Sequence, residues 1–186
     1  MDDKGELFFE ARCTEVSLRD FTKILFSWGS AFVCVNGIND DPSKFMCVIL
    51  KEEDRPEWMA PEKCVLWDAL PLVESFHQVS AVLQTEEEAK KTVKPIRKHY
   101  GEWLTPLQGG QCIDIVPVGI NKATGIYRVM EHFGASFPDM IAVGDNLNDV
   151  DMIREFHSYA MENGVDEIKE IADAVVTDVT QIMERE

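Results

Sequence analysis

From Cys112 onward the sequence alternates short apolar runs with segments of helical periodicity, and this alternation constrains the fold more than any other feature. The apolar runs cover residues 113–117, 140–143, 159–161 and 174–176. Strands that are apolar throughout and alternate with helices form parallel sheets whose faces are covered by those helices. We therefore expect an α/β protein whose C-terminal part is a parallel, Rossmann-like sheet covered on both faces.

The helices between these runs have recognisable ends and faces. Residues 123–133 are expected to form a helix that presents Ile126, Val129, Met130 and Phe133 on one face, with Gly134 as its C-cap. A second helix is expected from the end of the 140–143 strand to about residue 157, and a third over residues 165–172. Each lies between two predicted strands, as a parallel sheet requires.

The N-terminal part of the chain has a mixed pattern. Strands are expected at residues 7–11, 31–36, 45–50 and 79–83, with a polar loop between the second and third of these. Residues 17–28 predict a helix capped by Ser17, and Thr85 is expected to cap a helix that runs to about Tyr100. A short helix is expected within residues 56–70, where Pro56 and Pro61 obscure its start. The pattern of this part therefore predicts a separate unit that contains both helices and strands.

Charge excludes some classes of partner. The 186 residues contain 34 acidic and 18 basic side chains, a formal net charge of −16. Nucleic acids and anionic membranes are bound by clustered Lys and Arg, so we expect neither as a partner. No apolar run approaches the roughly 20 residues of a membrane-spanning helix, and the acidic first residues do not resemble a secretory signal. We expect a cytoplasmic protein.

The cysteines are five in number, widely spaced and without a CxxC pair. That pattern fits neither a disulfide framework nor a zinc site. We interpret them as buried thiols.

A cation site is indicated after the 140–143 run, where the chain continues as Gly144-Asp145-Asn146-Leu147-Asn148-Asp149. Ligands of open parallel sheets bind beyond the carboxyl ends of the strands. Carboxylate and carboxamide oxygens suit a hard cation such as Mg²⁺, and a glycine at the start allows a sharp backbone turn. The alternative is that Asp149 and Asp151 only occupy the first turn of the next helix, where negative charge is favoured.

Lys122 is a second candidate because it falls in the first turn of its helix, where the helix dipole opposes a cation. A compensating anion, either a phosphate or a carboxylate, would explain its position. The alternative is an exposed surface lysine.

Together these segments resemble the C-terminal half of the Cof-type branch of the haloacid dehalogenase superfamily. The resemblance rests on the stretch from Val118 to Gly125, the Gly144-Asp145-x-x-Asn148-Asp149-x-x-Met152 run, and the segments 159–164 and 171–173. It implies a Mg²⁺-dependent phosphatase of small phosphorylated metabolites that works through an aspartyl-phosphate. By resemblance, Lys122 steadies the nucleophile and the phosphoryl group, Asp145 ligates Mg²⁺, Asp149 orients metal-bound water or the lysine, and Asn148 shapes the phosphate site. Asp149 is also a candidate metal ligand.

The family also requires an Asp-x-Asp-Gly segment that supplies the nucleophile, and the sequence does not contain one. Residues 4–9 resemble the hairpin that precedes the family's cap domain. We therefore expect residues 1–14 to be a remnant of a core hairpin, 15–117 an α/β cap domain, and 118–186 the C-terminal half of the hydrolase core.

This organisation suggests an N-terminally incomplete enzyme, inactive alone and binding Mg²⁺ weakly or not at all. A catalytically inactive binding or regulatory relative and one half of a split enzyme are the alternatives. A homodimer through an exposed sheet edge is a further expectation.

Overall fold

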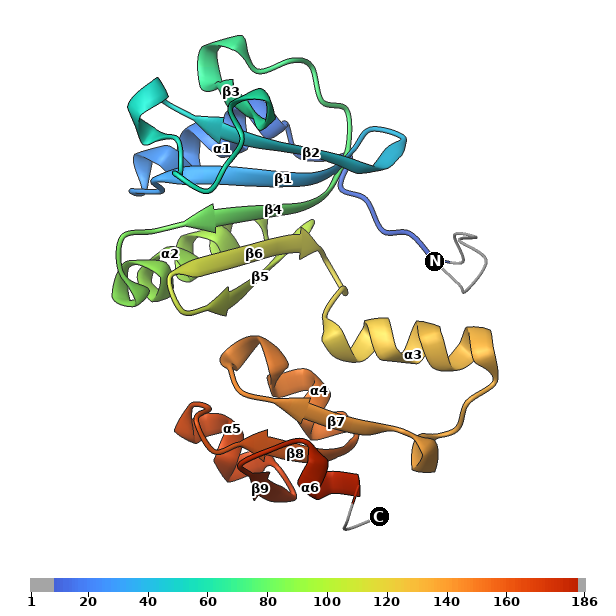
Figure 1. The fold of residues 1–186 in the computed structure, drawn as a ribbon. Coiled ribbons are helices and arrows are strands. Elements are labelled where there is room, and N and C mark those ends of the chain that lie inside the picture. Colours follow the sequence, from blue (N-terminus) through green and yellow to red (C-terminus); the bar gives the residue numbers. More distant parts are fainter. Residues whose placement is uncertain (1–8, 184–186) are drawn as a thin grey trace. The chain divides into compact units, whose positions relative to one another are not determined.

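A computed structural model describes residues 9–183 of the chain, which fall into two compact units (Figure 1). The large unit is Ala11–Gly119. The small unit runs from Ile120 to the C-terminus and includes the chain's first residues up to Glu10. Within the described residues, no helix combines the length and the apolar character needed to cross a membrane.

The large unit contains a six-stranded sheet with the order β3-β2-β1-β4-β6-β5. All neighbouring pairs are antiparallel except β2 and β3. The strands are β1 (Phe32–Ile38), β2 (Asp41–Ile49), β3 (Cys64–Leu66), β4 (Phe76–Val82), β5 (Leu104–Gly109) and β6 (Cys112–Pro117). Four of them match predicted strands. The sequence did not indicate β5, because Pro106 argues against a central strand, but β5 is an edge strand, where proline is tolerated.

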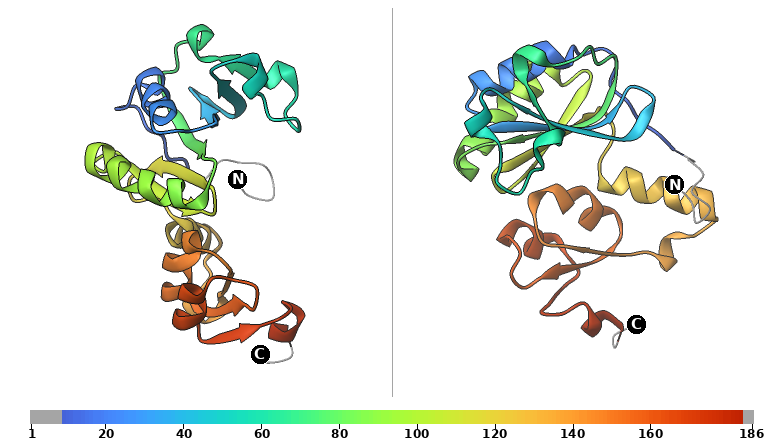
Figure 2. Two further views of the ribbon diagram at one scale, coloured as in Figure 1. Left: turned by 90° about the vertical axis from the view of Figure 1, so that its left-hand side faces the viewer. Right: turned by 45° about the horizontal axis from the view of Figure 1, so that its top comes forward.

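Two helices cover one face of this sheet, as the left view of Figure 2 shows. Helix α1 (Leu18–Ser27) begins at Ser17, whose hydroxyl accepts from the Asp20 amide. Helix α2 (Glu86–Tyr100) begins at Thr85, which forms a capping box with Glu88. The predicted helices and both N-caps are confirmed. Their apolar faces join the inward side chains of the strands in one large buried cluster, which is the core of the unit.

The opposite face of the sheet carries part of the segment that links β2 to β4, with Met59, Cys64 and Leu66 packed there. Later residues of the same segment, Trp67, Leu70 and Val73, pack on the helix-covered side. We predicted a short helix within residues 56–70, and that prediction is wrong. The segment forms only the 3-10 turns Glu52–Asp54, Pro61–Lys63 and Trp67–Ala69, together with β3. Pro56 and Pro61 lack the backbone donors that a helix interior needs. Met59 from this segment is buried against the sheet.

The small unit contains a three-stranded parallel sheet with the order β7-β8-β9. Its elements are α3 (Lys122–Phe133), β7 (Ile141–Gly144), α4 (Val150–Glu155), β8 (His157–Met161), α5 (Asp166–Ile171), β9 (Ala174–Val176) and α6 (Thr180–Met183). The βαβ alternation is therefore confirmed for the runs at 140–143, 159–161 and 174–176. The expectation that 113–117 belongs to the same parallel sheet is wrong, because this run is β6 of the antiparallel sheet in the large unit. Helix α3 ends at Gly134, whose φ of 66° is left-handed, as a glycine C-cap allows.

Helices cover the two faces of this sheet unequally. Helices α3, α4 and α5 pack on one face around Ala142 and Ala160, whereas Ile182 of α6 joins Tyr159 and Val176 on the other. The expectation for α3 was wrong in part, because Met130 is buried whereas Val129 and Phe133 are exposed. Strand β7 lies at the edge of the sheet, with Ile141 exposed.

The N-terminal expectations fall mostly on residues outside those described. Residues 1–8 are not described, and they include all of the hairpin expected at 4–9 except Phe9. In the predicted strand 7–11, residues 9–11 have no regular structure, and the first pairing from residue 9 onward is an isolated bridge between Cys13 and Phe76.

Candidate active site

The predicted site residues come from two neighbouring junctions of the small unit. Lys122 is the first residue of α3, and Asp145, Asn148 and Asp149 follow Gly144 at the carboxyl end of β7. Residues 147–149 form a 3-10 turn that leads directly into α4. The arrangement places all four residues at the end of a parallel strand where ligands of such sheets bind.

Asp149 is the buried centre of this arrangement, with only 4% of its side chain exposed. Its Oδ2 accepts from the backbone N–H groups of Asp145 at 3.0 Å and of Asn146 at 3.2 Å. Its Oδ1 accepts from the Lys122 ammonium. A carboxylate that loses this much hydration needs such charged and amide donors. Asp149 therefore does more than occupy a helix first turn.

Lys122 reaches Asp149 from α3, and 47% of its side chain is exposed. The anion that compensates for its first-turn position is thus a carboxylate of the same unit. Within the described residues, the Lys122 ammonium has this one carboxylate partner. An ammonium has three donors, so one bond to Asp149 leaves two N–H groups for another anion.

A second contact joins the same two junctions. The Asn121 side chain caps α3 by accepting from the Thr124 amide at 2.8 Å, and it donates through Nδ2 to Asp151 Oδ2 at 2.8 Å. Asn121 had no predicted role, although Asn before a helix is a recognisable N-cap signal. The contact fixes the start of α3 beside α4 and so limits the position of Lys122.

Asp145 is exposed, and its backbone is held on both sides. Its N–H donates to Asp149, and its carbonyl accepts from the Val165 amide at 2.9 Å. Gly164 lies against it, because a Cβ on Gly164 would come 2.9 Å from the Asp145 Cα. The backbone position of Asp145 is therefore defined, while its carboxylate faces solvent.

Gly144 has a different role from the one expected. Its φ is not in the positive range, so the turn does not require glycine for backbone reasons. A Cβ at this position would lie 2.7 Å from the Asp149 Cβ. Glycine is needed here because Asp149 packs directly on the strand end.

The residues fit Mg²⁺ only as part of a coordination shell. Mg²⁺ is commonly held by one or two carboxylates, with waters and substrate phosphate completing an octahedron. Asp145 offers one exposed carboxylate, whereas both oxygens of Asp149 already have donors. Among residues 9–183, no three His, Cys, Asp or Glu side chains converge as a metal site. Asn148 is half-buried.

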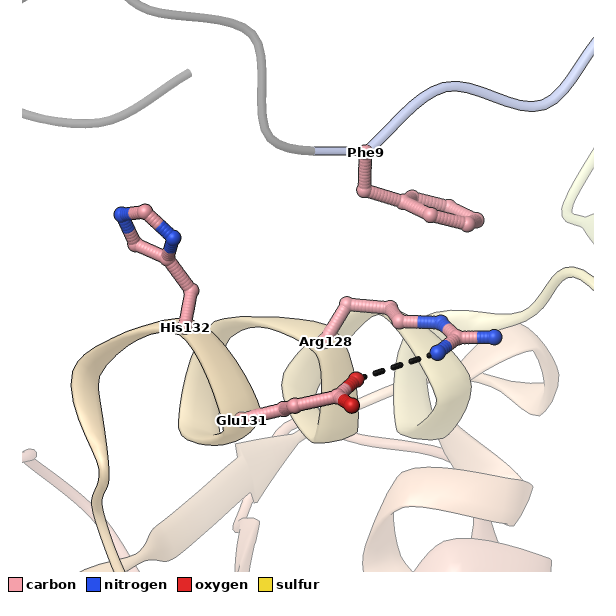
Figure 3. A pocket seen from close by; sticks show the side chains of 4 residues that line it. All are labelled: Phe9, Arg128, Glu131 and His132. Carbon is pink, nitrogen blue, oxygen red and sulfur yellow. Dashed lines mark hydrogen bonds and ion pairs between the residues drawn. The ribbon is translucent and has the colours of Figure 1, made fainter.

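A pocket elsewhere in the small unit shares no residue with this group (Figure 3). Arg128 lies over the Phe9 ring, 5.1 Å from its centre, and pairs with Glu131 at 3.1 Å; His132 completes the lining. Arg128 thus already has a carboxylate partner from the same helix. This pocket is not part of the Lys122 group.

The fold and this group define a class: an α/β protein with a lysine and acidic residues gathered at the carboxyl end of a parallel sheet. Residues 48–182 match the family model of the haloacid dehalogenase-like hydrolases. The chain belongs to that family.

Two curated relatives from Bacillus subtilis (strain 168) are the 5-amino-6-(5-phospho-D-ribitylamino)uracil phosphatases YcsE and YitU. They are 41% and 40% identical to this chain over 64 and 73 residues, which are 34% and 38% of the chain. The matched stretch spans only 26% of each relative.

Solved structures with a similar fold include the HAD subclass IIB sugar phosphatase BT4131, with a TM-score of 0.72 at 17% identity, over 98% of this chain and 70% of that one. SMU.1108c from Streptococcus mutans UA159 matches with a TM-score of 0.67 at 18% identity, over 92% of this chain and 69% of that one. At these identities the likeness shows the fold alone.

Proposed function

We propose that this chain supplies the lysine–aspartate side of the active site of a phosphatase that acts on small phosphorylated metabolites. The observation that carries the proposal is the Lys122–Asp149 ion pair, in which the carboxylate is buried and the ammonium half-exposed. Family membership and the names of the Bacillus relatives support the same reaction class.

In this proposal Lys122 neutralises the charge of a bound phosphoryl group. Phosphoryl transfer depends on positioning and charge neutralisation more than on covalent machinery of the protein. Asp149 keeps the ammonium at the strand end, and Asn121 keeps the helix that carries it in place. Asn148 would contact the phosphate, and Asp145 would hold Mg²⁺, which neutralises phosphoryl oxygens when bound. Asp149 as a metal ligand stays a prediction.

The nucleophile is the part that this sequence does not provide, since it contains no Asp-x-Asp-Gly segment. We propose that an aspartyl-phosphate forms in an intact protein that carries such a segment, and that the 186-residue chain alone is inactive. Loss of the attacking group in an enzyme of this kind costs on the order of 10⁴-fold in rate or more. An inactive regulatory relative or a split enzyme are the alternatives.

Phosphate binding tests the role of Lys122 separately from turnover. We expect inorganic phosphate with Mg²⁺ to shift the backbone amide resonances of residues 144–149 in the purified chain, and Lys122→Met to remove that shift. Lys169→Met is the matched control, because Lys169 lies in the same unit and pairs with Asp166 at 3.6 Å. Equal binding by both variants would contradict the assignment of Lys122.

Turnover of para-nitrophenyl phosphate tests the missing nucleophile. We expect no Mg²⁺-dependent hydrolysis by the chain alone. If the DNA upstream of Met1 encodes an in-frame Asp-x-Asp-Gly segment, we expect a protein that contains both this segment and the chain to hydrolyse the substrate. Turnover by the chain alone that Asp145→Ala abolishes would show that it carries its own nucleophile. Phosphate binding without turnover in the extended protein would favour the inactive relative.

The edge of β7 supports a proposal about assembly. Among residues 9–183, strand β7 pairs only with β8, and its first residue, Ile141, is 40% exposed. Exposed strand edges tend to pair with other chains. We expect the 186-residue chain to form a homodimer through this edge, with Ile141→Lys weakening it. Light scattering over a range of protein concentrations measures this, and a monomer at all concentrations would rule the dimer out.

A further inference from the structure

Three cysteines lie side by side on the face of the large sheet that the helices leave open. Cys34 of β1 is directly opposite Cys47 of β2, and Cys47 is in turn opposite Cys64 of β3. We call these three residues the thiol row. The sequence spacing conceals it, because the pairing of Cys34 with Cys47 depends on the register of the β1–β2 hairpin, and a long connection separates β2 from β3. The expectation of buried thiols holds for Cys34 and Cys47, whereas Cys64 is half-buried.

Strand geometry brings Cys34 and Cys47 within bonding reach. Directly opposite residues of an antiparallel pair have Cα atoms about 4.5–5.5 Å apart. Disulfides span Cα distances of roughly 4.4–6.8 Å. Side chains of opposite residues also point to the same face, so the two sulfur atoms face each other without any movement of the backbone.

Contacts within the row favour the Cys34–Cys47 pair over Cys47–Cys64. The neighbouring Cys47 thiol lowers the pKa of Cys34, whereas Cys34 and burial, with a smaller part from Cys64, raise the pKa of Cys47. The Cys64 thiol instead donates to the Ala60 carbonyl at 3.8 Å. Cys34 is also the more exposed member of this pair, so we assign the first attack to its thiolate, the form of a thiol that attacks a disulfide.

Other groups near the row do not compete for this role. Cys112 lies on the same face, where burial and the neighbouring Asp114 raise its pKa to about 12. Cys13 belongs to the cluster under the helices, on the opposite face. Asp114 accepts from Ser80 at 2.6 Å and from Gln78 at 2.8 Å, and these donors satisfy its carboxylate.

Met59 controls access to the pair. Cys34 is 8% exposed and Cys47 is fully buried, and Met59 packs with both in one apolar cluster. The turn that carries Met59 is held by two hydrogen bonds, from Arg55 Nη1 to the Met59 carbonyl at 2.7 Å and from the Met59 amide to the Pro56 carbonyl at 2.9 Å. Opening this short turn would expose the sulfur atoms while the sheet stays paired.

We infer that Cys34 and Cys47 are a redox modification site that forms a reversible cross-strand disulfide with a small disulfide as oxidant. The Cys34 thiolate attacks one sulfur of the small disulfide, forms a mixed disulfide and expels one thiolate. That thiolate takes the proton of Cys47. The Cys47 sulfur then attacks the Cys34 sulfur and expels the second thiolate, which takes up from solvent the proton that Cys34 released on ionisation. Two protein thiols are oxidised, and one small disulfide is reduced to two thiols.

Disulfide mapping of the native chain tests this inference. The protein is incubated with hydroxyethyl disulfide, quenched in acid, digested and analysed by mass spectrometry. We expect a cross-linked peptide pair containing Cys34 and Cys47 that has lost two hydrogen atoms and that dithiothreitol reverses. Cys34→Ser and Cys47→Ser should each eliminate it, whereas Cys64→Ser and Cys112→Ser should retain it. Met59→Ala should accelerate its formation severalfold.

The wild-type mapping decides the outcome even if a serine variant folds poorly. A cross-link that contains Cys64, a mixed disulfide on Cys34 that never closes, or reaction only after addition of denaturant would each overturn the inference. The site lies within the large unit and does not depend on phosphatase activity, so a failure of the proposed function leaves this test unaffected.

Discussion

The two units bury their apolar side chains to different extents. The large unit has one continuous cluster between helices and sheet, with Phe21 and Phe76 fully buried, and a second cluster on the opposite face. The small unit has two smaller clusters on opposite faces of its sheet. Both units leave large apolar side chains exposed, but the shorter small unit leaves more: Val129, Phe133, Phe137, Ile141, Val175 and Val179, against Leu50, Trp58, Leu72 and Val118 in the large unit. The unit with the candidate active site is therefore the one with the weaker core.

This difference predicts that the two units unfold at different denaturant concentrations. The unfolding of each unit can be measured separately. All four tryptophans, Trp28, Trp58, Trp67 and Trp103, lie in the large unit, so their fluorescence reports its unfolding alone. Hydrogen exchange measured on peptides of residues 120–183 reports the small unit.

The largest effect is expected from Phe76→Ala in the large unit. Phe76 is fully buried in β4, and truncation of a buried Phe costs about 3–5 kcal/mol through lost burial and a remaining cavity. Phe133→Ala is the control in the small unit, because Phe133 is 58% exposed and its loss should change stability by less than about 0.5 kcal/mol. Urea unfolding measures both. Similar costs at the two positions would mean that the small unit buries Phe133 in solution.

Lys122→Met should have the next largest effect, in the small unit. The substitution leaves the buried Asp149 carboxylate without its cation, and an unpaired buried acceptor costs about 1–3 kcal/mol. Because the Lys122 side chain is partly exposed to solvent, the loss of stability should be smaller than for a fully buried ion pair. Hydrogen exchange at residues 144–149 should accelerate. Lys169→Met, at a surface pair, should leave it unchanged.

The fold of the small unit was largely readable from the sequence because its signals are local. Apolar strand runs, the Gly134 C-cap and the loop from Gly144 to Asp149 each lie within a few residues of one another. A general rule for parallel sheets predicts Lys122 and Asp145 at one edge of the sheet, whereas the link between Asp149 and the lysine was expected only from the family resemblance. The direct ion pair, and the reason for Gly144, depend on packing distances that no sequence pattern contains.

The large unit was less readable because its determinants are not local. Strand β5 is stabilised by its pairing with β6 although it contains Pro106, and β3 is stabilised by its pairing with the distant β2. The thiol row depends on the register of three strands, so cysteine spacing alone could not indicate it. The exposure of Val129 and Phe133 was not predicted, because helical periodicity identifies an apolar face of a helix but does not show whether another element covers that face.

Gly144→Ala should destabilise the small unit by about 1–2 kcal/mol, since the new methyl group would overlap Asp149, 2.7 Å from its Cβ. The loop can relieve the overlap only by moving Asp149 away from the two backbone amides that bind it. Faster hydrogen exchange in residues 144–149, with unchanged tryptophan fluorescence, is the expected result. Unchanged exchange would mean that the loop packs less tightly on the strand than the structure indicates.

Gly125→Ala should have the smallest effect, and the opposite sign. Gly125 lies inside α3, and a Cβ there would meet no atom within 4 Å. Glycine in a helix interior costs roughly 0.5–1 kcal/mol relative to alanine, mainly through the entropy of the unfolded chain. The variant should therefore stabilise the small unit, which a shift of its unfolding to higher urea concentration would show.

The same substitution also tests what covers α3. Gly125, Val129 and Phe133 are spaced four residues apart and so share one side of the helix. If another chain packs closely on that side at high protein concentration, the added methyl group will weaken the association while the isolated chain is still stabilised. Stabilisation at low and high concentration alike would show that this side of α3 stays in solvent, and a loss of stability at low concentration would contradict the open space beside Gly125.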